Sequence, residues 1–68
     1  MIGMRTKELI SAWKLGIISW SDSDLFFDAA LREGRLTEEN IGEYMFMGLN
    51  SAGDAPAFKH IDTRKYLS

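Results

Sequence analysis

Two short stretches of this 68-residue chain contain the same types of residue in the same order. "GIISWSD" begins at Gly16 and "GRLTEEN" begins at Gly34; in each, an apolar residue follows two positions on, then a hydroxyl residue, then a carboxylate or amide three positions later. Glycine readily takes the left-handed conformation that often ends a helix. A hydroxyl residue followed by an acidic or amide side chain is typical of a helix start. We therefore interpret both stretches as corners between helices and not as functional sites.

Apolar spacing predicts a helix on either side of the first corner. Large apolar residues at one-turn spacing indicate a first helix over residues 5–15. The stretch "LFFDAALREG" indicates a second helix over residues 20–33. Its N-cap is either Ser19 or Ser21, since each has an aspartate three residues later, and we slightly prefer Ser21 because it also pairs an apolar residue before the cap with one after it.

The second corner predicts a third helix over residues 38–48, with Thr37 as its N-cap. Residues 1–49 are then a helical domain, and residues 50–68 are a loop followed by a C-terminal arm of the same domain. This arm is either extended against the helices or a short fourth helix capped at Asp62. The predicted fold class is all-α, a small three-helix bundle made of helical hairpins.

Composition limits the core and the compartment. A chain of this size buries only about 60% of the surface that its unfolded form exposes, so its core is marginal. Hydrophobic residues make up 46% of the chain, which is too apolar for a disordered segment. The chain has no cysteine and no apolar run that approaches the roughly 20 residues needed to cross a bilayer. We therefore expect a folded cytoplasmic protein without disulfides and without membrane contact.

The charges are unevenly distributed. Residues 1–15 and 50–68 carry an excess of Lys and Arg, whereas residues 16–49 carry an excess of Asp and Glu. The pair of helices around the second corner has the spacing of a helix-turn-helix, but Glu38 and Glu39 would face the phosphates of DNA. Nucleic acid is therefore a disfavoured partner. A transcriptional regulator that binds nucleic acid through its basic termini is kept as an alternative.

No residue pattern points to catalysis or to a cofactor. His60 is the one histidine, and without cysteine or a second histidine it has no partner set typical of a metal site or an activated nucleophile. The sequence has no glycine-rich phosphate loop. We expect a protein that is not an enzyme and that carries no metal or cofactor.

The chain has more large apolar side chains than three short helices can bury. On a helix, the adjacent Phe26 and Phe27 point about 100° apart, so both cannot face one core. Exposed apolar area of more than a few hundred Å² usually marks an association site. We therefore expect a protein partner, with a homodimer favoured. The candidate partner-binding residues are the surplus aromatic and apolar residues and the basic residues of the tail: Trp13, Trp20, Phe27, Met47, Phe58, Arg64, Lys65 and Tyr66.

The unit L-x-x-G-x-[IL]-[ST]-x-x-[DEN] is complete at the second corner and has Trp13 in place of its leucine at the first. Within residues 9–44 it resembles the helical hairpins of very short proteins encoded in phage tail operons, the XkdX-like proteins among them. The resemblance implies an origin in a phage or another mobile element. The expected function is a small non-enzymatic protein–protein interaction module, such as an inhibitor or adaptor that binds a larger host or phage protein. A structural component of a phage particle or larger assembly is the other alternative.

Overall fold

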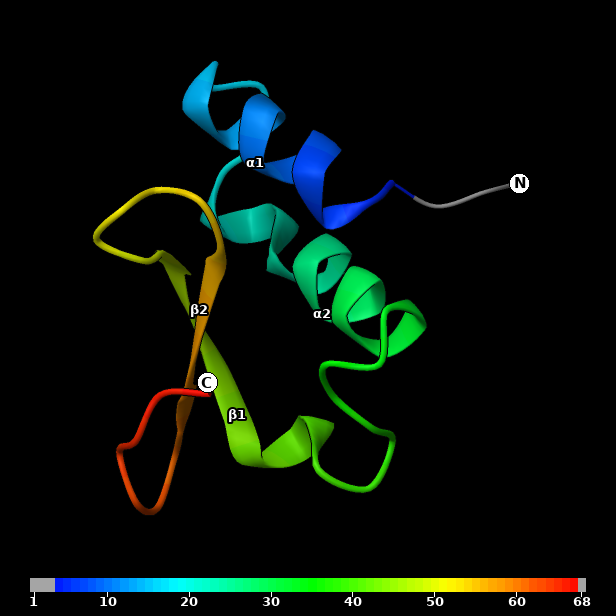
Figure 1. Ribbon diagram of the computed structural model, residues 1–68, viewed down its shortest axis with the longest axis vertical. Helices are drawn as coiled ribbons and strands as arrows, with labels where there is room; N and C mark the ends of the chain where they lie inside the picture. The colour runs from blue at the N-terminus through cyan, green and yellow to red at the C-terminus, as the bar shows by residue number, and fades with distance from the viewer. Residues whose placement is uncertain (1–3, 68) are drawn as a thin grey trace.

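The computed structural model describes residues 4–67 and combines two α-helices with an antiparallel β-hairpin (Figure 1). The outer ends of the predicted ranges 1–49 and 50–68, residues 1–3 and 68, lie outside the described residues. The all-α prediction is wrong, because the fold is mixed α/β. The elements in chain order are α1 (Thr6–Lys14), the 3-10 helix η1 (Trp20–Asp22), α2 (Ser23–Arg32), the 3-10 helix η2 (Ile41–Glu43), β1 (Tyr44–Leu49) and β2 (Pro56–His60).

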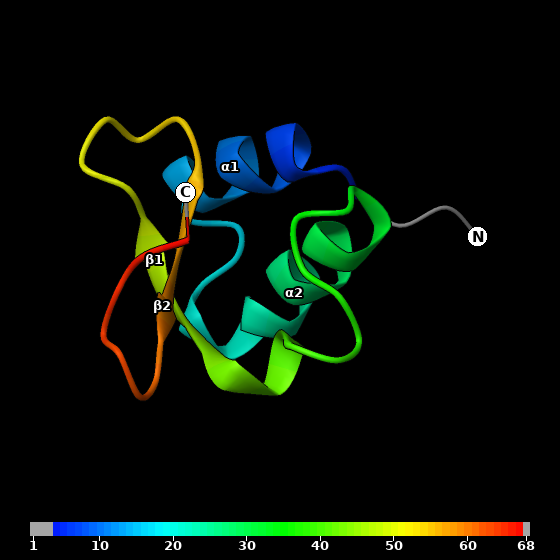
Figure 2. The same ribbon diagram turned by 60° about the horizontal axis from the view of Figure 1, so that its bottom comes forward.

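The helices lie to one side of the hairpin (Figure 2). Within the described residues, neither helix is long and apolar enough to cross a membrane.

The predicted glycine corners form with identical geometry. Gly16 and Gly34 both have a φ of 76°, the left-handed conformation that a residue with a Cβ rarely adopts. In each corner the glycine N–H donates to the carbonyl three residues back and the next N–H donates to the carbonyl five residues back, which is the Schellman motif. The bonds are Gly16 N to Trp13 O (3.1 Å), Ile17 N to Ala12 O (2.9 Å), Gly34 N to Leu31 O (3.2 Å) and Arg35 N to Ala30 O (2.8 Å).

The helix start after the first corner uses Ser19 and not the slightly preferred Ser21. The Ser19 N–H donates to Asp22 Oδ2 at 3.0 Å, so the carboxylate closes the turn three residues on. The turn η1 follows Ser19 directly, and α2 continues from Ser23. The preference for Ser21, which rested on an apolar pair around that cap, was wrong, because a 3-10 turn capped by Ser19 precedes α2.

The predicted third helix over residues 38–48 does not form, although its N-cap does. Thr37 N donates to Asn40 Oδ1 at 2.8 Å, and Asn40 N donates back to Thr37 Oγ1 at 3.2 Å. This reciprocal cap is followed by a single 3-10 turn, η2, and then by β1. Gly42 lies at that point, and glycine lowers helix stability by about 1 kcal/mol relative to alanine.

The sequence of β1 alternates with the period of a strand. Phe46 and Gly48 are buried, whereas Met45 and Met47 are exposed. A period of two places successive side chains on opposite faces of a sheet. The short apolar stretch also fitted a helical pattern, and its pairing with β2 decides between the two.

The hairpin pairs β1 with β2 in antiparallel register. Met45 lies opposite Lys59 and Phe46 opposite Phe58, and the register shifts before the end of the ladder. Gly48, with φ of 81°, lies at this shift, as expected of a G1 bulge. A loop then joins the strands. Its ends are fastened by the side chains of Asn50 and Asp54, at 2.8 Å from Nδ2 to Oδ1.

The C-terminal arm is extended, and the alternative of a fourth helix is not realised. After β2 the chain turns at Arg64, which has φ of 61°, and runs back along β2. Lys59 forms a bridge with Tyr66, and Leu67 N donates to Phe58 O at 2.8 Å. Residues 65–67, here called the return segment, therefore pair with the edge of β2 that β1 leaves open.

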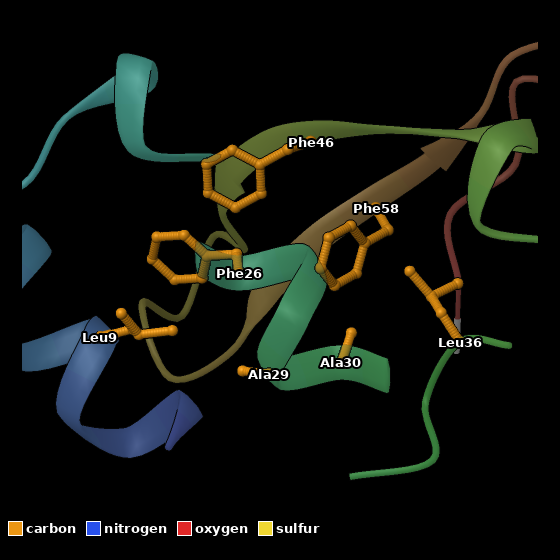
Figure 3. Packing of buried hydrophobic residues seen from close by; sticks show 7 residues of the cluster. All are labelled: Leu9, Phe26, Ala29, Ala30, Leu36, Phe46 and Phe58. Atoms are coloured by element: carbon orange, nitrogen blue, oxygen red, sulfur yellow. The ribbon is translucent and has the colours of Figure 1, made fainter. Parts of the chain in front are cut away.

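The core lies between the helices and the inner face of the hairpin. Phe26 of α2 stacks on Phe46 of β1, with ring centroids 4.5 Å apart and planes 21° apart. The Trp13 ring meets both phenylalanines edge-on, at 5.8 Å and 5.5 Å. Figure 3 shows Phe26 between Leu9 of α1 and Phe46. The buried cluster as a whole consists of Leu9, Phe26, Ala29, Ala30, Leu36, Phe46 and Phe58.

A carboxylate at the end of α2 caps the start of α1. Glu33 Oε2 accepts hydrogen bonds from the N–H of Thr6 at 2.9 Å and from Thr6 Oγ1 at 2.8 Å. The N–H groups of the first helical turn have no partner within the helix, so this contact satisfies one of them. The backbone hydrogen bond from Thr6 is the largest of the influences that hold the pKa of Glu33 below its ordinary value.

A substitution at Gly48 tests whether β1 contains the bulge. A Cβ at this position would lie 3.0 Å from the Trp20 ring, and the backbone is left-handed. We expect Gly48→Ala to lower the free energy of unfolding by at least about 1–2 kcal/mol, the typical penalty for a left-handed residue with a Cβ. Gly42→Ala is the control, since nothing lies within 4 Å of its Cβ. Urea denaturation measures both, and equal stability of the two variants would contradict the bulge.

Glu33 tests the contact between α2 and α1. Because its pKa is lowered in the folded state, the contact stabilises the protein above the ordinary pKa of 4.5 and weakens as the pH falls through the folded pKa. We expect Glu33→Gln to lower the free energy of unfolding by about 1 kcal/mol at neutral pH, as loss of a helix cap does. The difference from the unmodified protein should shrink in acid. Glu39→Gln, which removes the same charge from an exposed residue, is the control. An identical dependence of stability on pH for both variants would refute the role of Glu33 as a cap of α1.

Candidate functional site

The face of the hairpin turned away from the helices carries a row of exposed and half-buried side chains. Lys59 lies directly between Met45 on β1 and Tyr66 on the return segment. Its ammonium group is 5.7 Å from the centre of the Tyr66 ring, within the range of a cation–π contact. Met47 follows two residues along β1. These four residues, here called the outer face, include three large apolar side chains that are 38–56% exposed.

An open groove adjoins the outer face. It has a volume of about 910 Å³ and runs between the second glycine corner, the hairpin loop and the return segment. Met47, Tyr66 and Leu67 contribute apolar walls. Arg35 is the only charged residue among those of the described chain that line it. A groove with apolar walls and a single cation is suited to a peptide side chain and a carboxylate.

The corner between α1 and η1 forms a second apolar surface. Leu15, Ile17 and Trp20 are 59–75% exposed. The tip of the Trp20 ring approaches Gly48, which is the residue next to Met47. The corner therefore adjoins the end of β1.

The structure divides the predicted partner-binding residues into three groups. Trp20, Met47 and Tyr66 present exposed apolar surface, and Arg64 and Lys65 are exposed at the start of the return segment. Trp13 and Phe27 are half-buried against the core. Phe58 is 2% exposed and lies in the core, where it leaves no surface for a partner.

Sequence reasoning missed several members of these surfaces. Met45 and Lys59 join the outer face because they are opposite each other in the hairpin. Alternation of period two in "YMFMG" was the available signal for Met45. Arg35 was treated only as part of a corner, and nothing local in the sequence places it beside a groove formed by residues 47–67.

His60 has a structural role. Its Nδ1 accepts hydrogen bonds from the N–H groups of Asp62 and Thr63, both at 3.2 Å, and its Nε2 lies 3.0 Å from Glu43 Oε1. Because an acceptor nitrogen carries no proton, these contacts assign the proton to Nε2, which donates to the carboxylate. Both ring nitrogens thus hold the turn before the return segment. Among residues 4–67, no cluster of three His, Asp or Glu side chains is arranged to hold a metal ion.

Comparison with protein-family models, with curated proteins and with solved structures finds no match to this chain. The first copy of the unit that resembles phage helical hairpins lies between α1 and α2, whereas the second is followed by η2 and the strand β1.

Proposed function

We propose that this protein is a small non-enzymatic protein-interaction module whose contact surface is the outer face together with the adjoining corner. The observation that carries the proposal is the course of the return segment. It pairs with the edge of β2 and adds Tyr66 to the outer face, so it does not cover Met45 and Met47. Apolar surface of this kind is typical of an association site.

The residues on this surface are of kinds enriched at protein interfaces. Trp20 and Tyr66 are aromatic, Met47 is flexible, and Lys59 borders them. Tryptophan and tyrosine supply a large share of binding energy in known complexes. A role as an inhibitor or adaptor that acts on a larger protein, in the cytoplasm, fits these properties.

The partner in this proposal is a second copy of the chain or a larger protein. In a homodimer, two outer faces would meet across a two-fold axis, so that each copy covers the other's Met45 and Met47. Light scattering across micromolar concentrations separates the two partners, because only self-association raises the mass of the isolated chain.

Affinity capture from the native cell, followed by mass spectrometry, tests the proposal. The chain is compared with Met47→Ser/Tyr66→Ser, which removes apolar surface without touching the core. We expect the double variant to lose partner binding, or self-association, by about tenfold or more, which corresponds to about 1.4 kcal/mol. Glu38→Gln/Glu39→Gln, on an exposed acidic segment, is the control and should behave as the unmodified chain does.

Two results would count against the proposal. The first is a strictly monomeric chain that captures no protein. The second is a captured partner whose binding is the same in the Met47→Ser/Tyr66→Ser variant, since the contact surface would then lie elsewhere.

A further inference from the structure

We infer that the groove beside the outer face receives an extended peptide that combines a carboxylate with an apolar side chain, and that Arg35 binds the carboxylate. This inference rests on the proposed interaction function and names the chemistry of the partner. It concerns the groove lined by Arg35, Met47, Ala57, Tyr66 and Leu67.

Arg35 is held within the described residues only by a long ion pair. Its guanidinium forms no hydrogen bond with the described residues, and its nearest carboxylate contact is 3.9 Å from Nε to Glu33 Oε1. That carboxylate is already engaged through its other oxygen with Thr6. A guanidinium presents parallel N–H groups that match both oxygens of a carboxylate, so the side chain is suited to an acidic ligand.

The surroundings of Arg35 favour an acidic occupant. A second hollow, of about 480 Å³, lies on its other side and brings Arg5, Lys7 and Arg32 to the same region. Among residues 4–67, the carboxylates that line that hollow are Glu33 and Asp54, against four cations, of which Arg32 is already paired with Asp28 at 2.9 Å. Of these cations, Arg35 alone among the described residues lines both hollows, so it is the cation that a peptide in the first groove meets.

The walls of the groove supply the seat for an apolar side chain. Met47, Ala57 and Leu67 present aliphatic surface, and Tyr66 presents an aromatic ring. Methionine adapts to irregular shapes and is common at surfaces that bind varied peptides. The carboxylate provides the orientation, and the apolar side chain provides buried area.

A protein segment fits this groove better than a nucleic acid does. Binding of single-stranded nucleic acid combines a continuous cationic track with several aromatic rings on which bases stack. The groove has one cation and one exposed ring, and the rest of its wall combines aliphatic residues with the uncharged polar residues Asn50 and Ser51.

Fluorescence polarisation with synthetic peptides tests the inference on the full chain. The probes are three labelled decapeptides in which leucine alternates with glutamate, with glutamine or with lysine, and a labelled single-stranded oligonucleotide. We expect the glutamate peptide to bind, and Arg35→Gln to weaken its binding by about tenfold. Lys14→Gln removes one positive charge from an exposed residue outside both hollows and should leave binding within about twofold. Methyl shifts of Met47 upon titration would place the peptide in the groove.

Each of the other outcomes contradicts one part of the inference. Equal binding of the glutamine peptide, or no effect of Arg35→Gln, would refute the acidic specificity and leave an apolar interaction module in place. Binding of the oligonucleotide in preference to all peptides would assign the groove to nucleic acid. If no probe binds and Arg35→Gln abolishes self-association, the groove binds a second copy of the chain instead of an acidic peptide. No binding with self-association unchanged would refute the groove as a docking site, while capture through the outer face would still support the proposed function.

Discussion

The stacking of Phe26 on Phe46 joins the helical part of the molecule to the hairpin, and the remaining architecture depends on it. The chain has no disulfide and a core of only a few large side chains, so one well-placed aromatic contact contributes a large share of the buried area. The Trp13 ring lies edge-on to both phenylalanines and extends the contact to α1. Because Phe46 must point toward α2, its neighbours in the strand must point away.

The outer face follows from that constraint. A strand that buries Phe46 necessarily directs Met45 and Met47 to the opposite side of the sheet. The hairpin is covered by helices on one side, and the return segment extends the sheet instead of covering its other side. The apolar surface is thus a geometric consequence of building a core from a two-layer fold in so short a chain. Its use as a contact surface is the proposal that the experiments above address.

The helical part of the fold could be predicted from the sequence because its signals are local. The Gly16 and Gly34 corners and the Ser19 and Thr37 caps each depend on residues within one or two turns, and all four form. The strand could not be predicted in the same way, because Thr37 gives the same helix-start signal as Ser19. What separates the two corners is the pairing of β1 with β2, which depends on residues 7–16 positions away along the chain.

The candidate site could be predicted from the sequence only in part. Trp20 and Met47 were found by asking which large apolar side chains cannot all face one core, and Tyr66 was found because the tail combines basic with large apolar residues. Phe58 was included because the tail was treated as an arm, whereas its position opposite Phe46 makes it a core residue. Arg35 was missed because the groove forms only when the second corner approaches the hairpin loop and the return segment.

The most direct test of this account is a nuclear Overhauser measurement between the Hα protons of Phe46 and Phe58. These residues are opposite each other in the hairpin. Hydrogen-bonded pairs alternate with pairs that share no backbone hydrogen bond, and Ile61 N donates to Glu43 O, so Phe46 and Phe58 form a pair of the second kind. In such a pair the two Hα protons approach closely. We predict a strong Hα–Hα signal between Phe46 and Phe58 and no helical contacts through residues 44–48. Helical contacts over that stretch, without a signal to Phe58, would contradict the strand, the outer face and the functions inferred from them.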